Sequence, residues 1–267
     1  MHKTDTRRAR LQTFGDELQH SQIIAKAMDY QDGAHEPAHF HHRAQLVCAM
    51  RGIVRVITPL GLWTLTEGSA LLIGSQVEHA LHMGGEVSLR TLYILPERLA
   101  RPERECRAIP MGDLLRAAIA GMFGPELDDA DGSREQLLVP LILRLLDGAP
   151  AHARDLRLPL PADWRLRTIC EALIAQPDNN ETLERWSERA HTSSRTLARL
   201  FRQETSMSFG QWREQLRLTE AMSRLLTGQP APSVAEELGY ASVRTFSVMF
   251  KRSFGCTPQR FQAGAPL

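Results

Sequence analysis

The segment from His39 to Gln45 groups side chains that can bind a metal or a polar ligand. On a β-strand, residues 39 and 41 point to the same face, so their imidazoles converge on one volume. Gln45 can add an amide oxygen, and His79 arrives from a later strand. Imidazole suits nickel, zinc, iron and copper alike. The pattern indicates a divalent transition metal, an organic effector or purely structural histidines at His39, His41, Gln45 and His79, with His42 and His82 expected at the surface.

A second chemically informative set lies on two short segments near residues 194–202 and 243–251. Guanidinium groups bind guanine edges in the major groove of DNA, and any cation can contact phosphate. Arg195, Arg199 and Arg244 are expected at guanine edges, and Arg202 and Lys251 at phosphates. The residues expected to face DNA are Ser194, Arg195, Thr196, Arg199, Arg202, Val243, Arg244, Thr245, Ser247 and Lys251.

Helical signals position this second set twice. Pro232-Ser233 followed by Glu236 predicts a capped helix, Gly239 its left-handed end, and Ser242 the cap of a second helix. The same plan occurs 242 − 193 = 49 residues earlier, where Ser193 is the cap. A helix, a turn and a second capped helix form a helix-turn-helix. Between the units, residues 208–227 predict one spacer helix of about 30 Å, close to the ~34 Å between successive major-groove faces.

The first half of the chain has a different pattern. Short apolar runs at 45–50, 53–57, 62–65, 70–73 and 87–95 alternate with Gly and Pro, which predicts an antiparallel barrel or jelly roll. Helical spacing at 113–122 and 134–146 predicts a hairpin that packs on the barrel or on a second subunit. The expected organisation is a frayed segment 1–22, a sensor barrel 23–95, a helical packing or dimerisation segment 96–147, a linker 148–161 and an all-α DNA-binding domain 162–267, an α+β multidomain protein.

The helical module resembles the AraC/XylS family of bacterial regulators. The resemblance covers about residues 162–263 and implies a double helix-turn-helix that binds promoter DNA. Ser187 stands where this family usually has alanine, and His191 where it usually has the turn glycine. The motifs that carry the resemblance are residues 195–201 (RTLARLF), Trp212 with Arg217-Leu218, Gly239-Tyr240, and 250–258 (FKRSFGCTP).

Residues 23–95 resemble the small-barrel cupins that serve as sensor domains in the same regulators. In metal-binding cupins the first motif supplies a carboxylate where Gln45 stands, and the Pro and Gly of the second motif are replaced by Gly74 and Gln76. The resemblance therefore implies a sensor site whose fourth ligand is a neutral amide.

Composition agrees with a cytoplasmic, non-membrane protein without setting its function. The net charge of +1 divides into 14 − 11 = +3 from residue 162 onward and 18 − 20 = −2 before it. The first ten residues lack the apolar core of a signal peptide, and no run reaches the ~18 apolar residues of a membrane span. Four scattered cysteines form no C-x-x-C pair, which gives no support to a zinc finger or a redox motif.

The leading interpretation is a ligand-responsive transcription regulator that binds double-stranded DNA, forms a homodimer and contacts a small-molecule effector, with RNA polymerase as a further partner. One alternative is a cupin-type metal-dependent enzyme tethered to a DNA-binding module. It would need a metal carboxylate and an acid–base pair that the sequence does not offer. A second alternative is a small-molecule buffer or structural protein that never touches DNA, and the arginines on both second helices count against it.

Overall fold

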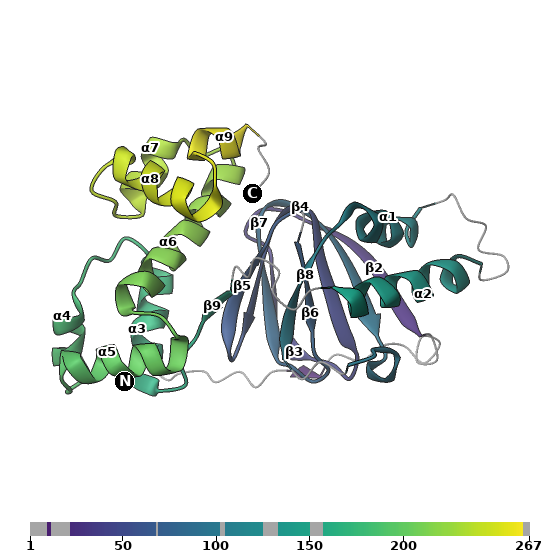
Figure 1. The fold of residues 1–267 in the computed structure, drawn as a ribbon, viewed down its shortest axis with the longest axis horizontal. Coiled ribbons are helices and arrows are strands. Elements are labelled where there is room, and N and C mark those ends of the chain that lie inside the picture. Colours follow the sequence, from purple (N-terminus) through teal and green to yellow (C-terminus); the bar gives the residue numbers. More distant parts are fainter. Residues whose placement is uncertain are drawn as a thin grey trace. The chain divides into compact units, whose positions relative to one another are not determined.

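The computed structural model describes residues 10–11, 22–67, 69–101, 105–124, 133–149 and 157–263 (Figure 1). Contacts divide the chain into two compact units, residues 1–58 with 64–156 and residues 59–63 with 157–267. Nearly all of the segment expected to be frayed, and residues 150–156 of the expected linker, lie outside the described residues. No helix in the described part combines the length and hydropathy needed to cross a membrane.

The first unit is built on a largely antiparallel sheet, to which the short parallel pair β1–β3 is the exception. Strand β7 is its centre, because it pairs with β2, β3 and β4. The pairing order β1-β3-β7-β4-β5-β9, with β2 on β7 and β6 between β4 and β8, does not close into a ring among the described strands. The strands are β1 (Arg10–Leu11), β2 (Ile23–Tyr30), β3 (His35–Phe40), β4 (Ala44–Thr58), β5 (Gly61–Leu65), β6 (Ser69–Ile73), β7 (His79–Ile94), β8 (Cys106–Pro110) and β9 (Arg157–Pro159).

Gly52 and Gly84-Gly85, which separate apolar runs in the sequence and so predict turns, lie inside long strands. The runs at 45–50 and 53–57 belong to the single strand β4, and the ladder with β7 shifts register on both sides of Arg51. Gly52 has φ +77°, so the glycine that predicts a turn forms a β-bulge instead. Gly84-Gly85 likewise lies inside β7. A bulge bends a strand without ending it, which is why the two signals look alike in the sequence.

The expected helical hairpin packs on one face of this sheet. Helices α1 (Asp113–Gly121) and α2 (Ser133–Gly148) lie side by side in Figure 1. Leu46, Leu72 and Leu92 from the sheet share a buried cluster with Ile119 of α1 and Ile142 of α2. Because side chains alternate along a strand, Gln45 next to Leu46 faces the opposite side of the sheet.

The second unit is helical apart from the pair formed by β9 and the first residues of β5. Its helices are α3 (Trp164–Ala175), α4 (Leu183–Arg189), α5 (Ser194–Thr205), α6 (Phe209–Leu226), α7 (Ala231–Glu237), α8 (Val243–Phe254) and α9 (Pro258–Gln262); the short 3₁₀ helix η2 (Pro96–Arg98) belongs to the first unit. Aromatic side chains form the two cores, with Phe201, Phe209 and Trp212 in contact beneath α5 and Phe246, Phe250 and Phe261 beneath α8.

Local cap signals place most of these helix ends. Ser193 and Ser242 accept hydrogen bonds from the backbone N–H groups of Thr196 and Thr245, as expected for N-caps. The expected capping box at Ser233 is wrong, because α7 starts at Ala231 after Pro230 and has no side-chain cap. Proline fixes its own φ near the helical value, so it begins the helix before the serine can cap it.

His191 has φ +48° at the turn between α4 and α5, the left-handed conformation that a glycine would adopt at lower cost. Replacing His191 with glycine removes about 1–2 kcal/mol of backbone strain, and the extra unfolded-state entropy offsets about 0.4–1 kcal/mol of that gain. We expect a melting temperature that is unchanged or up to about 4 °C higher. Ser206→Gly, at φ +59°, is the matched control. A lower melting temperature for His191→Gly alone would show that the imidazole makes a stabilising contact of its own.

Candidate nucleic-acid interface and metal centre

Each of the helices α5 and α8 presents an exposed basic face. Arg195, Arg199, Arg202, Arg244 and Lys251 are all exposed, as their sequence pattern predicts. Of these, Arg199 alone has a side-chain partner among the described residues, since its guanidinium donates to Gln203 Oε1 at 2.7 Å. The other four make no ion pair or hydrogen bond through their side chains within the described part of the chain.

Several arginines on the other helices of this unit are paired with carboxylates, although Arg260 of α9 has no side-chain partner among the described residues. Arg189 contacts Glu181 at 2.5 Å, Arg224 contacts Glu237 at 2.7 Å, and Arg165 contacts Asp163 at 2.6 Å. The contrast matters because an arginine without a carboxylate partner keeps its full attraction for phosphate and for base edges. Free cations are thus concentrated on the two helices whose N-caps mark them as second helices of a helix-turn-helix.

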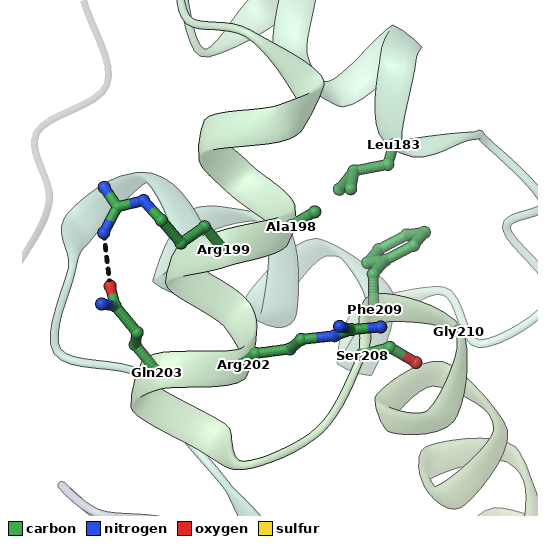
Figure 2. Close-up of a pocket in the computed structure, with 8 residues that line it drawn as sticks. All are labelled: Leu183, Ala198, Arg199, Arg202, Gln203, Ser208, Phe209 and Gly210. Carbon is green, nitrogen blue, oxygen red and sulfur yellow. Dashed lines mark hydrogen bonds between the residues drawn. The ribbon is translucent and has the colours of Figure 1, made fainter.

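An open depression of about 650 Å³ lies beside α5, lined by residues from α4, α5 and the start of α6 (Figure 2). Arg199 and Arg202 lie on its α5 wall, and Phe209 and Gly210 of α6 line it together with the N-cap residue Ser208. Two successive residues of the basic face therefore border a concave surface.

The remaining residues of the expected DNA-facing set lie at the helix starts or at the edge of the basic face. Val243 opens α8 and is 38% exposed, and Thr245 is exposed next to its cap. Ser194, Thr196 and Ser247 are half-buried. Three exposed α8 residues are not among the expected DNA-facing residues: Val248, Arg252 and Ser253. Aligning α8 with α5 at the 49-residue spacing would have revealed Val248, because Val248 then matches Arg199.

Arg217 of α6 ties the two helix-turn-helix units together. Its guanidinium donates to the backbone carbonyls of Pro177 at 2.7 Å and Asn179 at 3.1 Å, and to Asn180 Oδ1 at 3.0 Å. The same group reaches the carbonyl of Gly239 at 3.4 Å. Residues 177–180 lead into the first helix-turn-helix, and Gly239 forms the turn of the second helix-turn-helix. This clamp holds the units in one relative orientation.

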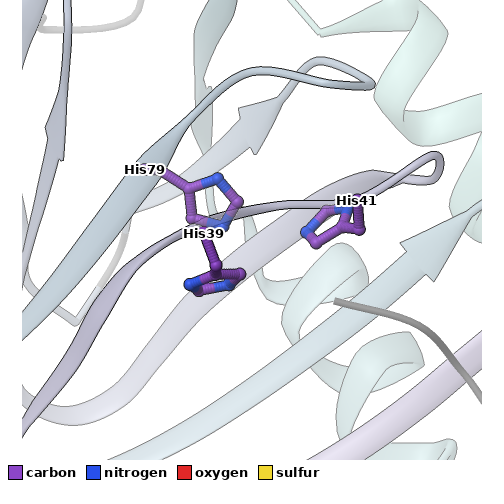
Figure 3. Close-up of side chains that lie close together, drawn as sticks. All are labelled: His39, His41 and His79. Atoms are coloured by element: carbon purple, nitrogen blue, oxygen red, sulfur yellow. The ribbon is translucent and has the colours of Figure 1, made fainter. Parts of the chain in front are cut away.

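The unit built on the β-sheet, residues 1–58 with 64–156, contains the histidine cluster that the sequence predicts. His39, His41 and His79 are 8%, 1% and 1% exposed, and one ring nitrogen of each lies within 4.8 Å of the others (Figure 3). Gln45 is fully buried beside them. His42 and His82 are exposed, as expected. Gln76 has φ +62°, so it holds the left-handed conformation of the glycine that it replaces.

Backbone acceptors orient all three rings in the same way. The Nδ1 atoms of His39, His41 and His79 lie 2.8, 2.5 and 2.8 Å from the carbonyls of Pro37, Arg43 and Val77. A carbonyl accepts only, so each Nδ1 carries a proton, and in a neutral ring Nε2 then keeps its lone pair. Burial lowers the pKa of His41 and lowers that of His79 to about 3, so both rings are neutral near pH 7.

Gln45 then faces these lone pairs with its own acceptor. Its Oε1 lies 3.0 Å from Nε2 of His41 and 2.9 Å from Nε2 of His79, while its Nε2 donates to Thr91 Oγ1 at 2.9 Å. The Nε2 atom of His39 has no hydrogen-bond partner in the described structure. Three nitrogen lone pairs and an amide oxygen without hydrogens between them are a donor set for a cation.

The fold and the basic helices together define a DNA-binding protein with two helix-turn-helix units. The helix-turn-helix domain family matches residues 186–264. The HTH-type transcriptional regulator NimR of Escherichia coli is 32% identical over 232 residues, which cover 85% of this chain and 82% of NimR. The chain belongs to the AraC/XylS family and is a sequence-specific DNA-binding transcription regulator.

Other relatives are regulators as well. The transcriptional activator RhaR of Pectobacterium atrosepticum is 26% identical over 248 residues, covering 85% of this chain and 86% of RhaR. A solved structure of ToxT from Vibrio cholerae covers 92% of this chain and 98% of ToxT, with 15% identity and a TM-score of 0.38. The two curated relatives NimR and RhaR support a regulator and give no support to the tethered-enzyme alternative.

Proposed function

We propose that α5 and α8 each enter a major groove of one promoter and read different parts of it. Arg195, Arg199 and Arg244 contact guanine edges, and Arg202 and Lys251 contact phosphates. The observation that carries this proposal is the concentration of cations without carboxylate partners on these two helices. The 18 residues of α6 span about 27 Å, which suits two reading helices on one side of the duplex.

Alanine variants of Arg199 and Arg244 test whether α5 and α8 contact different half-sites. Each should weaken binding to DNA selected from a random library by about 1–3 kcal/mol, or roughly 5- to 150-fold, and relax base preference in its own half-site. Arg185→Ala is the matched control, because Arg185 is exposed but paired with Glu188 on α4. Loss of preference at the same bases in both variants would show that the helices do not occupy separate grooves.

A divalent transition metal at the histidine cluster is the second part of the proposal. Nε2 of His39, His41 and His79 would bind it, with Oε1 of Gln45 as the fourth ligand. Ligand type favours nickel, zinc, iron or copper over magnesium and calcium. Metal–nitrogen bonds of about 2.0–2.1 Å place ligand atoms roughly 3.3 Å apart in a tetrahedral site. The ring nitrogens lie within 4.8 Å of one another, so shifts of about 1 Å in their positions would bring them to bonding distance of one metal ion.

The neutral ligand set also indicates the kind of effector. The cluster of described residues contains no carboxylate, so a bound dication would keep its charge in a buried site. An anionic small molecule that coordinates through oxygen would offset this charge. We therefore propose that the sensor site binds a metal ion together with an anionic effector.

Elemental analysis of untagged protein purified without chelator tests the metal. About one equivalent of transition metal per chain, or its uptake on titration, supports the site. If the protein neither carries nor accepts a metal, the Gln45 amide must be turned so that its NH₂ group donates to His41 and His79. The histidines would then serve as hydrogen-bond partners for an organic effector.

The homodimer is proposed on the helical hairpin. Leu114 of α1 is 57% exposed and Leu137 of α2 is 62% exposed, whereas Ile119 of α1 and Ile142 of α2 are buried in the cluster shared with the sheet. Contiguous exposed apolar patches mark subunit interfaces, and a second subunit placed on this hairpin would cover both leucines.

A further inference from the structure

The two reading helices match residue by residue when 49 is added to each number in α5. The caps Ser193 and Ser242 correspond, since 242 − 193 = 49, and each accepts from the N–H three residues on. The buried Phe201 corresponds to the buried Phe250. The exposed faces of α5 and α8 can therefore be compared position by position.

The basic positions agree except for two, since Gln203 corresponds to Arg252 and Arg199 has no basic counterpart. Arg195 corresponds to Arg244, and Arg202 to Lys251. Arg199 corresponds to Val248, which is 58% exposed. With 3.6 residues per turn, Val248 lies about 160° from the centre of the buried face formed by Phe246, Phe250 and Phe254, so it points straight away from the core.

A valine at this position does not stabilise the fold. Its branched side chain has lower helix propensity than arginine, and it is left in solvent without burial. Its surface neighbours Arg244, Lys251 and Arg252 are cations, which draw the surface onto DNA. Among the base edges in the major groove, thymine alone offers an apolar group, its C5-methyl.

We propose that Val248 reads a thymine C5-methyl, so that the half-site of α8 carries thymine where the half-site of α5 carries guanine opposite Arg199. This inference rests on the proposed placement of both helices in major grooves. The two heads then recognise chemically different half-sites. A single chain consequently binds its site in one direction only.

Deoxyuridine substitution tests the contact, because uracil differs from thymine only by the methyl group. Full-length protein is used to select a duplex from random DNA, and each thymine of that duplex is replaced in turn. Wild type should bind about 3- to 10-fold more weakly when one thymine in the α8 half-site is replaced. Val248→Ala should bind the thymine and uracil duplexes equally.

An exchange of side chains supplies the positive control. Val248→Arg should select guanine at that position, and Arg199→Val should create uracil sensitivity in the other half-site. Unchanged thermal melts would show that the variants fold. Wild type that binds the selected DNA with no uracil-sensitive thymine in the α8 half-site would overturn the inference and leave the two-headed function standing. Failure to select any DNA would overturn that function itself.

Discussion

Protein with His79 replaced by alanine should bind zinc or nickel at least about 100-fold more weakly than wild type. The substitution removes one of three Nε2 ligands, a larger loss than that of an outer hydrogen-bond partner, which alone costs about 10- to 100-fold in metal affinity. Calorimetric titration of metal into full-length, untagged, metal-free protein measures the change.

His42 is the matched control for this experiment, because it lies one residue from His41 but is exposed. His42→Ala should keep the affinity of the wild type. Gln45→Glu should raise it, because a carboxylate is a stronger ligand than an amide and supplies the missing negative charge. Wild-type affinity in His79→Ala would place any metal elsewhere.

Gly239→Ala should destabilise the helical unit by about 3 kcal/mol or more. Gly239 has φ +71°, and a Cβ there would lie 2.7 Å from the backbone oxygen of Asp178 and 3.1 Å from Asn180 Nδ2. Left-handed backbone strain alone costs about 1–2 kcal/mol, and the clash adds to it because Arg217 fixes the opposing loop. Chemical denaturation measures the difference.

Gly228→Ala separates strain from clash. Gly228 has φ +88° but nothing within 4 Å of the added Cβ, so this variant should lose only the strain of about 1–2 kcal/mol. Equal losses of unfolding free energy in the two variants would show that loop 177–180 does not support the turn of the second helix-turn-helix. A further loss of DNA affinity in Gly239→Ala at a temperature where it remains folded would tie the clamp to the spacing of the two heads.

Features set by local chemistry could be predicted from the sequence. Ser193 and Ser242 cap their helices, and Gly239 and His191 take left-handed conformations, because caps and turns depend on a few adjacent residues. The alternation of His39 and His41 on one segment, with His79 on another strand, was enough to predict their convergence.

Features that depend on distant partners could not be predicted. The pairing of Arg189 with Glu181 and the lack of such a partner for Arg244 follow from packing, and the sequence shows both only as arginines. The clamp of Arg217 joins residues about 40 positions apart. Closure of the barrel depends on pairing between distant strands, and the described strands pair in an order that does not return to its start.

A hydroxyl-radical footprint of full-length protein on its selected duplex tests the central claim most directly. Two helices held by α6 and the Arg217 clamp should protect two segments on the same side of the DNA, about 10–10.5 base pairs apart from centre to centre. Arg199→Ala should weaken one protected segment and Arg244→Ala the other. A footprint confined to one major groove, or one that both variants weaken at the same bases, would contradict a two-headed regulator.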